Sequence, residues 1–321
     1  MSLLIYAESA EGKFKKVAFE LASYAKKVAE SLGTTVTAVT INAGDVSELA
    51  KYGVDKVLKV KNEALSGFSA KAYADVIKQA AQKEGAKVVV LSSTTDSIYL
   101  SSLVAVGLDA GFASNVVGLP VSTNPFQVKR TAFSNKAFTI TEITTNVKVL
   151  GLAKNSYGII ENNVSIAEED FNPTIDAADF SVKVTAVEKS SGKIAIADAD
   201  IVVSGGRGLK GPENWGMIEE LASVLGAATA CSKPVSDLGW RPHGEHVGQT
   251  GKPVATNLYI AIGISGAIQH IAGINSSKVK VVINNDPEAP FFKVADYGVV
   301  GDAFEIVPQL IEKLKAFKAQ H

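Results

Sequence analysis

The sequence is poor in the features that build disulfide frameworks and strongly charged surfaces. Its 321 residues include a single cysteine, Cys231, which excludes an intrachain disulfide and a cysteine-rich metal site. Lysine and arginine number 32 against 33 aspartates and glutamates, so no overall basic field attracts nucleic acid. We therefore expect no nucleic-acid partner and a reducing, cytoplasmic location.

The N-terminus lacks the features of a targeting segment. The apolar run within residues 1–8 has no basic flank and is far too short for a signal peptide or a membrane span. The absence of an arginine-rich leader also argues against import into an organelle. We expect no direct membrane insertion and interpret this run as a first β-strand.

The remaining composition is that of a globular protein with real cores, since 46% of residues are hydrophobic and 20% are charged. The length favours two domains. Strand-like and helix-like stretches alternate up to about Asn115, which predicts an α/β domain with a parallel sheet. The expected strands are 2–7, 35–41, 56–60 and 87–91, and the expected helices are 13–32, 46–52, 70–84 and 97–107.

Beyond Asn115, Thr- and Val-rich pieces without long helices predict an antiparallel extension of the first domain, with strands at 126–133, 137–143 and 180–188. The polar segment 190–193 follows, and we place the domain boundary there. The N-terminal α/β domain is then 1–190, and residues 191–321 form a C-terminal doubly wound parallel-sheet domain. Its expected elements are strands at 201–203, 227–231, 258–262, 279–283 and 297–300, and helices at 212–225 and 303–317.

Two polar runs in the second domain stand out. Val247–Lys252 and Gly263–His270 place glycine, hydroxyl, amide and imidazole groups where a core would need apolar ones. The strand between them turns through glycines into a predicted helix, and free backbone N–H groups with the positive end of the helix dipole suit a phosphate. Loops after strand ends are also where open parallel sheets bind cofactors. These runs therefore predict a site for a polar, phosphate-bearing ligand.

Gly206–Gly211 formally satisfies the dinucleotide fingerprint G-x-G-x-x-G. The acidic residue expected about 20 positions later for the ribose is missing, because the next strand ends at Cys231–Lys233. A tight turn between strand and helix is the simpler interpretation, although NAD binding stays open. His243–His246 with Cys231 offers only a weak zinc pattern in a loop, and we predict no metal site and no catalytic triad or carboxylate pair.

Five strings of the second domain occur in the same order in a known family. They are Ser204–Lys210, Val247–Lys252, Gly263–His270, Asn285–Pro290 and Val294–Gly298. Together they resemble the alpha subunit of electron transfer flavoproteins (ETF) across the whole second domain. The first domain resembles it in general plan and in its opening strand.

The resemblance implies one FAD bound in the second domain, and its expected contacts are Arg207, Ser232, Lys233, Val247, Gly248, Gln249, Thr250, Ser265, Gly266, Ala267, Ile268, Gln269, His270, Asn284, Asp302 and Ala303. Hydroxyl and backbone N–H groups of Ser265, Gly266 and Ser232 suit the pyrophosphate. Thr250 and His270 are expected nearest the isoalloxazine, where a donor favours the reduced, anionic ring. The expected contacts with adenosine and its ribose are Asn284 and Asp302.

Lys233 departs from the family, which commonly has arginine after the serine at this strand. Lysine keeps the positive charge near the flavin but loses the planar guanidinium that can stack on a ring or fork to two acceptors. His270 without this context would be read as a structural histidine.

The resemblance also implies a role. The chain would be an electron carrier rather than an enzyme, taking electrons from acyl-CoA dehydrogenases of fatty acid β-oxidation and passing them to a membrane ETF:quinone oxidoreductase. A beta subunit would complete the heterodimer and hold AMP, and the N-terminal domain would serve as a scaffold for the subunit interface. A bifurcating family member that uses NADH and a second FAD, and an NAD-dependent oxidoreductase, are the alternatives.

Overall fold

The computed structural model describes residues 2–133, 135–182, 184–185, 194–196 and 199–320. It divides into two compact units, one of Met1–Phe133 with Ala137–Val187 and one of Ser134–Lys136 with Glu188–His321. The predicted two-domain α/β fold is confirmed. The predicted boundary at residue 190 and the polar segment 190–193 lie outside the described residues, so that boundary stays a prediction.

The N-terminal unit is built on a sheet whose described strands run in the order β10-β9-β7-β11-β6-β1-β4-β5-β12, with β8 paired to β9. The strands are β1 (Ser2–Tyr6), β4 (Thr35–Ile41), β5 (Lys56–Val60), β6 (Val88–Ser92), β7 (Gly111–Val116), β8 (Ser122–Thr123), β9 (Phe126–Ala132), β10 (Ala137–Glu142), β11 (Lys148–Leu152) and β12 (Ala167–Asp170). Pairing is parallel from β7 and β11 through β12 and antiparallel among β7, β8, β9 and β10. The expected antiparallel extension is therefore present.

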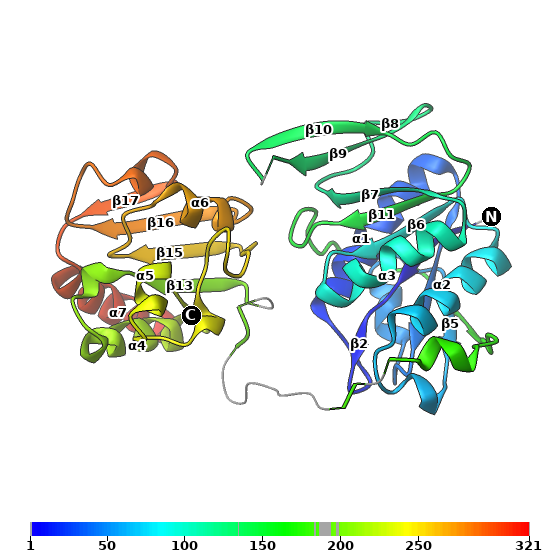
Figure 1. Cartoon of the computed structure of the whole chain (residues 1–321), viewed down its shortest axis with the longest axis horizontal. Coiled ribbons are helices and arrows are strands. Elements are labelled where there is room, and N and C mark those ends of the chain that lie inside the picture. The colour runs from blue at the N-terminus through cyan, green and yellow to red at the C-terminus, as the bar shows by residue number, and fades with distance from the viewer. Residues whose placement is uncertain (1, 134, 183, 186–193, 197–198, 321) are drawn as a thin grey trace. The chain divides into compact units, whose positions relative to one another are not determined.

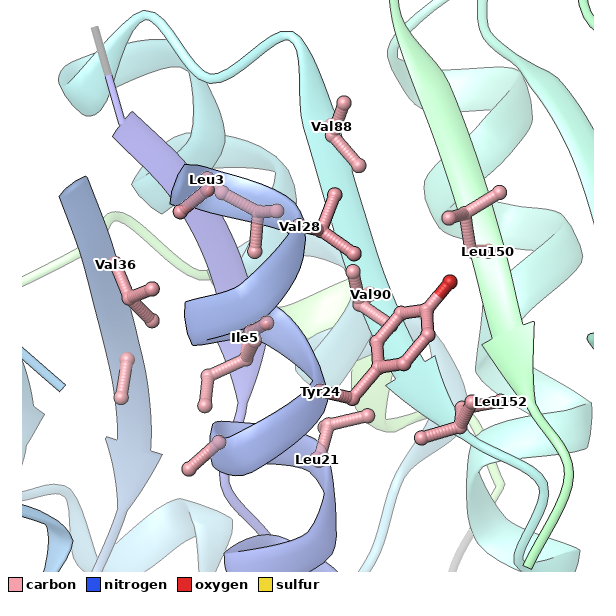
Figure 2. Packing of buried hydrophobic residues seen from close by; sticks show 14 of the residues in the cluster. Leu3, Ile5, Leu21, Tyr24, Val28, Val36, Val88, Val90, Leu150 and Leu152 are labelled. Atoms are coloured by element: carbon pink, nitrogen blue, oxygen red, sulfur yellow. The ribbon is translucent and has the colours of Figure 1, made fainter. Parts of the chain in front are cut away.

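Three helices cover the two faces of this sheet: α1 (Lys16–Leu32), α2 (Ala70–Glu84) and α3 (Thr95–Gly107). Because side chains alternate along a strand, Leu3 and Ile5 pack under α1 while Leu4 and Tyr6 face α2 and α3. Figure 2 shows Tyr24 of α1 among the strand side chains of the first core. Each face of the central strands thus has its own apolar core.

Sequence periodicity missed or misjudged several pieces of this unit. Lys13 begins no helix, because Lys13–Phe14 (β3) pairs with Ser9–Ala10 (β2) and α1 starts at Lys16. No strand forms among the described residues of 180–188, where Ala177–Phe180 is a 3-10 turn. Strands β7, β11 and β12 were not predicted. β11 returns to the parallel part of the sheet beside β6, a placement set by tertiary packing.

The C-terminal unit has a fully parallel sheet in the order β14-β13-β15-β16-β17. Figure 1 shows β13, β15, β16 and β17 of this sheet. Its strands are β13 (Ile201–Gly205), β14 (Ala228–Cys231), β15 (Leu258–Ile262), β16 (Val279–Asn284) and β17 (Tyr297–Val300). The helices are α4 (Gly216–Leu225), α5 (Lys233–Asp237), α6 (Ile268–Ile274) and α7 (Ala303–Gln320). The order reverses at β13, whose neighbours are β14 on one side and β15 on the other.

Both faces of the second sheet are covered. α4 and α7 pack on one face, over Val203 and Ile260, and the other face buries Tyr259 and Val282 with Phe291 and the loop that contains Val247. The predicted doubly wound arrangement is therefore confirmed. Within the described residues, no helix has both the length and the apolar character needed to cross a bilayer.

Candidate functional site

The carboxyl ends of all five strands of the C-terminal sheet meet at one edge. Gly205 lies in register with Cys231 on one side and Ile262 on the other, and Ile262 pairs with Ile283. Backbone hydrogen bonds continue the ladder past the strand ends, from N of Ser232 to O of Gly205 (3.1 Å) and from N of Gly206 to O of Ile262 (2.9 Å). The loops that follow the strands thus converge where the strand order reverses, the position at which open parallel sheets bind ligands.

Three glycines allow two of these loops to touch. A Cβ on Gly206 would lie 2.1 Å from the carbonyl oxygen of Gly263, and one on Gly208 would lie 2.7 Å from the Cα of Gly263. Gly263 itself has φ +62°, a left-handed conformation that favours glycine. The backbones after β13 and β15 therefore form a close glycine contact that no larger residue permits.

A second glycine contact seats the loop 247–251 on α6. A Cβ on Gly273 of that helix would lie 2.5 Å from the Cα of Gly248. The backbone N–H of Gln249 donates to O of Gln269 (2.7 Å), and N of Val254 donates to O of Gly273 (2.8 Å). Both polar runs of the sequence are thereby brought together, although they are separated by β15.

A buried polar pair lies beneath this contact. Tyr259 of β15 is fully buried, and its hydroxyl oxygen lies 2.9 Å from Nε2 of His270 in α6. The ring of Phe291 stacks parallel to that of Tyr259 at 6.4 Å. Burial lowers the pKa of His270 to about 4, the neighbouring His246 adds to the lowering, and the Val247 backbone opposes it. His270 is therefore neutral at physiological pH.

Arg241 and Glu245, which precede the loop 247–251, form an ion pair. Arg241 donates from Nε and Nη2 to both carboxylate oxygens of Glu245 (2.9 and 2.7 Å), in the bidentate geometry that arginine favours. Burial raises the pKa of the Cys231 thiol to about 12, so this cysteine is not a reactive thiolate. Glu245 is engaged by Arg241, and no group of three metal-binding side chains forms among the described residues.

In the N-terminal unit, a side chain of the protein itself occupies the equivalent position at the carboxyl ends of the strands. Its strand order reverses at β1, and the carboxylate of Glu8 fills the edge between β1 and β6 with only 2% of the residue exposed. Hydroxyls of Ser92, Thr94 and Ser97 donate to Oε1, and Lys15 pairs with Oε2 at 3.1 Å. An internal anion thus occupies this edge, whereas the C-terminal unit presents glycine-lined loops at its own edge.

Comparison with known proteins identifies the family. A family model described as the electron transfer flavoprotein FAD-binding domain matches residues 195–275, and one described as the electron transfer flavoprotein domain matches residues 3–188. The chain is 36% identical to the electron transfer flavoprotein subunit alpha of Thermoanaerobacterium thermosaccharolyticum over 98% of both chains.

Two further relatives carry the same name. The protein of Syntrophomonas wolfei is 37% identical over 97% of this chain and 98% of its own, and that of Bacillus subtilis is 34% identical over 98% and 97%. This chain belongs to the electron transfer flavoprotein alpha-subunit family. FAD is accordingly its cofactor.

The C-terminal edge fits the FAD of this flavoprotein family. Its glycine contacts hold the loop backbones that follow β13 and β15 against each other at the strand ends, where open parallel sheets bind ligands. Among the described residues, Nδ1 of His270 is buried without a hydrogen-bond partner of good geometry, and so is Nδ1 of His246. Buried polar atoms are rarely left so in a native structure, so they fit a site whose remaining partner is a ligand.

Most of the predicted FAD contacts are either exposed or buried in the structure. The exposed ones are Arg207, Gln249, Thr250, Ser265, Ala267, Ile268 and Gln269. Buried positions are Ser232, Val247, Gly248, Gly266 and His270. Val247 packs its side chain into the core, which leaves only its backbone for a ligand. Gly266 has φ +86° and lies against the backbone of Phe291, so it shapes the turn.

The outer predicted contacts have structural partners of their own. The amide of Asn284 donates to O of Ile264 (3.0 Å), and its carbonyl accepts from N of Asp286 (3.0 Å). Asp302, just before α7, accepts from N of Phe304 (2.9 Å), and Ala303, the first residue of that helix, is buried. Lys233 pairs with Asp237 four residues on, at 3.3 Å. These partners do not test the predicted flavin contacts.

The structure also bears on two local predictions. The helix predicted to follow the second polar run is α6, which has only seven residues. After Gly206–Gly211, a 3-10 helix (Pro212–Trp215) leads into α4 at Gly216, so the predicted helix 212–225 is present. Within the segment Gly206–Gly211, Gly206 and Gly208 are required by their packing on Gly263.

Sequence reasoning missed Tyr259, Phe291 and Gly273. Tyr259 was interpreted only as part of an apolar strand. Nothing in its local pattern indicates that its hydroxyl contacts a histidine eleven residues later in the chain. The Gly248–Gly273 contact joins positions 25 residues apart. Only the folded backbone reveals either contact.

Proposed function

We propose that this chain is the FAD-carrying alpha subunit of a heterodimeric electron transfer flavoprotein. The observation that supports it most directly is the convergence of the loop 247–251, the turn 263–266 and buried His270 at the reversal point of the C-terminal sheet. Bound FAD supplies the electron-transfer chemistry there. The chain's own residues bind and orient it and set the electrostatic environment of its ring.

The chemistry of each side chain suggests its role. Ser232, Ser265 and Gly266 hold the pyrophosphate by hydroxyl and backbone N–H groups, and Arg207 and Lys233 supply nearby positive charge. Thr250 and His270 lie where the two loops meet and face the isoalloxazine as hydrogen-bond donors. Asn284, at the end of β16, and Asp302, after β17, adjoin the adenosine part. Backbone groups of Val247, Gly248, Ala267, Ile268, Gln269 and Ala303 complete the contacts, with the amide of Gln249.

The same proposal assigns the partners. A beta subunit completes the heterodimer and holds AMP, and the N-terminal unit contributes to the interface between subunits. The flavoprotein acts as a carrier, which receives electrons from acyl-CoA dehydrogenases and delivers them to ETF:quinone oxidoreductase. The internally filled edge at Glu8 supports the assignment of nucleotide binding to the other unit and to the partner.

The test is to co-express the chain with its neighbouring beta-like subunit and count flavin and AMP released per heterodimer. One FAD with one AMP is the expected result. Two FAD molecules per heterodimer would instead indicate a bifurcating flavoprotein that uses NADH. Absence of flavin would contradict the proposal. Turnover of NADH by this chain alone would favour an NAD-dependent oxidoreductase.

The pyrophosphate assignment has its own variant pair. Ser265→Asp places a negative charge beside the phosphates and is expected to abolish FAD retention, whereas Ser265→Ala removes one hydroxyl and weakens it less. Full retention of FAD by Ser265→Asp would remove Ser265 from the phosphate site.

A further inference from the structure

The hydrogen bond between Tyr259 and His270 has a direction that the structure allows us to assign. The two atoms, the hydroxyl oxygen of Tyr259 and Nε2 of His270, lie 2.9 Å apart in a fully buried setting. A neutral imidazole has one nitrogen that donates and one that accepts, so the partner of Nε2 decides which nitrogen carries the hydrogen.

Two arrangements of the hydrogen atoms are possible. If Nε2–H donated to the phenol, the hydroxyl hydrogen of Tyr259 would need another acceptor. The hydroxyl of Ser204 interacts with the phenol. If it accepted the phenol hydrogen, its own hydrogen would have no acceptor of good geometry among the described residues. A buried donor without an acceptor is unfavourable. Donation by Tyr259 satisfies both groups and is the favoured arrangement.

Both groups also hold the protonation states that this arrangement needs. Burial raises the pKa of Tyr259, so the phenol keeps its hydrogen at neutral pH. Burial lowers the pKa of His270 to about 4, so the ring is not an imidazolium. The stacked ring of Phe291 and the alternation of β15 fix the phenol in place.

We propose that Tyr259 is a positioning residue that donates to Nε2 and thereby fixes His270 as the neutral Nδ1–H tautomer. Nδ1, which then carries the ring hydrogen, has no hydrogen-bond partner of good geometry among the described residues. His270 adjoins the loop that carries Val247 and Gly248, and the Val247 backbone interacts with its ring. Because Nδ1 has no hydrogen bond of good geometry among the described residues, this N–H can also donate to an acceptor bound beside the loop. The opposite tautomer would present a lone pair and repel such an acceptor.

The proposal rests on the proposed function in one respect, namely that the acceptor is the flavin ring of bound FAD. A neutral donor at the electron-rich edge of the ring favours its reduced, anionic form. Tyr259 acts on the ring only through His270. Its removal is expected to lower the flavin midpoint potential while leaving FAD bound.

The test uses the full chain with its subunit and FAD, labelled with 15N in its histidines, at neutral pH. In the wild type, the Nδ1 signal of His270 is expected in the protonated range and the Nε2 signal in the unprotonated range. Tyr259→Phe keeps the buried ring but removes the donor, so the two signals are expected to shift toward a tautomer mixture, with a lower potential. Tyr297→Phe is the matched control, because Tyr297 is 68% exposed in the same unit.

A wild-type spectrum with the hydrogen on Nε2, or with both nitrogens protonated, would overturn the proposal even if the Tyr259→Phe protein does not fold. Identical His270 signals in Tyr259→Phe would overturn it as well. FAD content is measured on the same samples. A wild type without FAD contradicts the proposed function, and the spectrum of that FAD-free chain still decides the tautomer.

Discussion

At the scale of single residues, the candidate site depends on positions that have no side chain. Gly206, Gly208 and Gly263 allow backbone to lie against backbone, and Gly248 and Gly273 do the same for the loop on α6. An interior packed at crystal density transmits the displacement caused by one added methyl group. The glycines therefore determine how the polar groups of both loops are placed.

Gly206→Ala tests this dependence. The new Cβ would lie 2.1 Å from the Gly263 carbonyl oxygen, so the backbone must shift, at a cost of about 1–3 kcal/mol. We expect a lower melting temperature and weaker FAD retention, measured by thermal unfolding and by flavin content. Gly216→Ala is the matched control, because a Cβ there meets nothing within 4 Å, and stability is expected to stay equal or rise. Equal losses in both variants would contradict this account.

At the scale of secondary-structure elements, helix ends carry several predicted ligand contacts. Asp302 lies just before α7 and accepts the backbone hydrogen of Phe304, and Ser232 is the N-cap position of the short helix α5. A residue at such a position has a structural role whether or not it also binds FAD. Substitutions must separate the two roles.

Asp302→Ala and Asp302→Ser separate them. Loss of the cap in Asp302→Ala is expected to reduce stability by about 1 kcal/mol, while serine still caps the helix and restores most of it. If the carboxylate also contacts the adenosine part, both variants lose FAD affinity. Thermal unfolding and FAD titration of the two proteins provide the comparison. Equal destabilisation by alanine and serine would show that the side chain does not cap α7.

At the scale of the whole molecule, the two units have separate cores and differ in what they bury at the sheet edge. The N-terminal unit buries a carboxylate with three hydroxyls and a lysine, and the C-terminal unit buries neutral histidines. The pKa of His246 is also lowered, chiefly by burial and then by His243. Acid is therefore expected to act on the C-terminal unit through its histidines.

The pH dependence of stability follows from His270. Its folded-state pKa of about 4 lies below the usual value, so the unfolded chain binds the proton more readily. The contribution of neutral His270 to the free energy of unfolding is fully present above about pH 6.5. It falls by roughly 3 kcal/mol as the pH drops toward 4. His270→Asn is expected to flatten this part of the curve, measured by denaturant unfolding from neutral pH to pH 4. Parallel curves for both proteins would contradict a buried neutral imidazole.

Local sequence pattern predicted some helices and strands accurately and missed others. Helix α2 and the strands β4, β5, β15 and β17 were predicted with the bounds that the structure gives, because each has strong periodicity and clear flanking turns. The strand expected at 180–188 is absent from the described part of that range, and β11 was missed. A short apolar run carries no information about which sheet it joins, so tertiary packing decided both cases.

The sequence by itself determined that this chain is an α/β protein with its polar ligand groups in the second half, because periodicity and glycine-rich strings are local properties. It also carried the resemblance that led to FAD. The tertiary structure decided which groups meet: the close approach of Gly206 to Gly263, the seating of Gly248 on Gly273, and the burial of His270 against Tyr259. These contacts join distant positions, and burial sets a protonation state only after the chain has excluded water around the group.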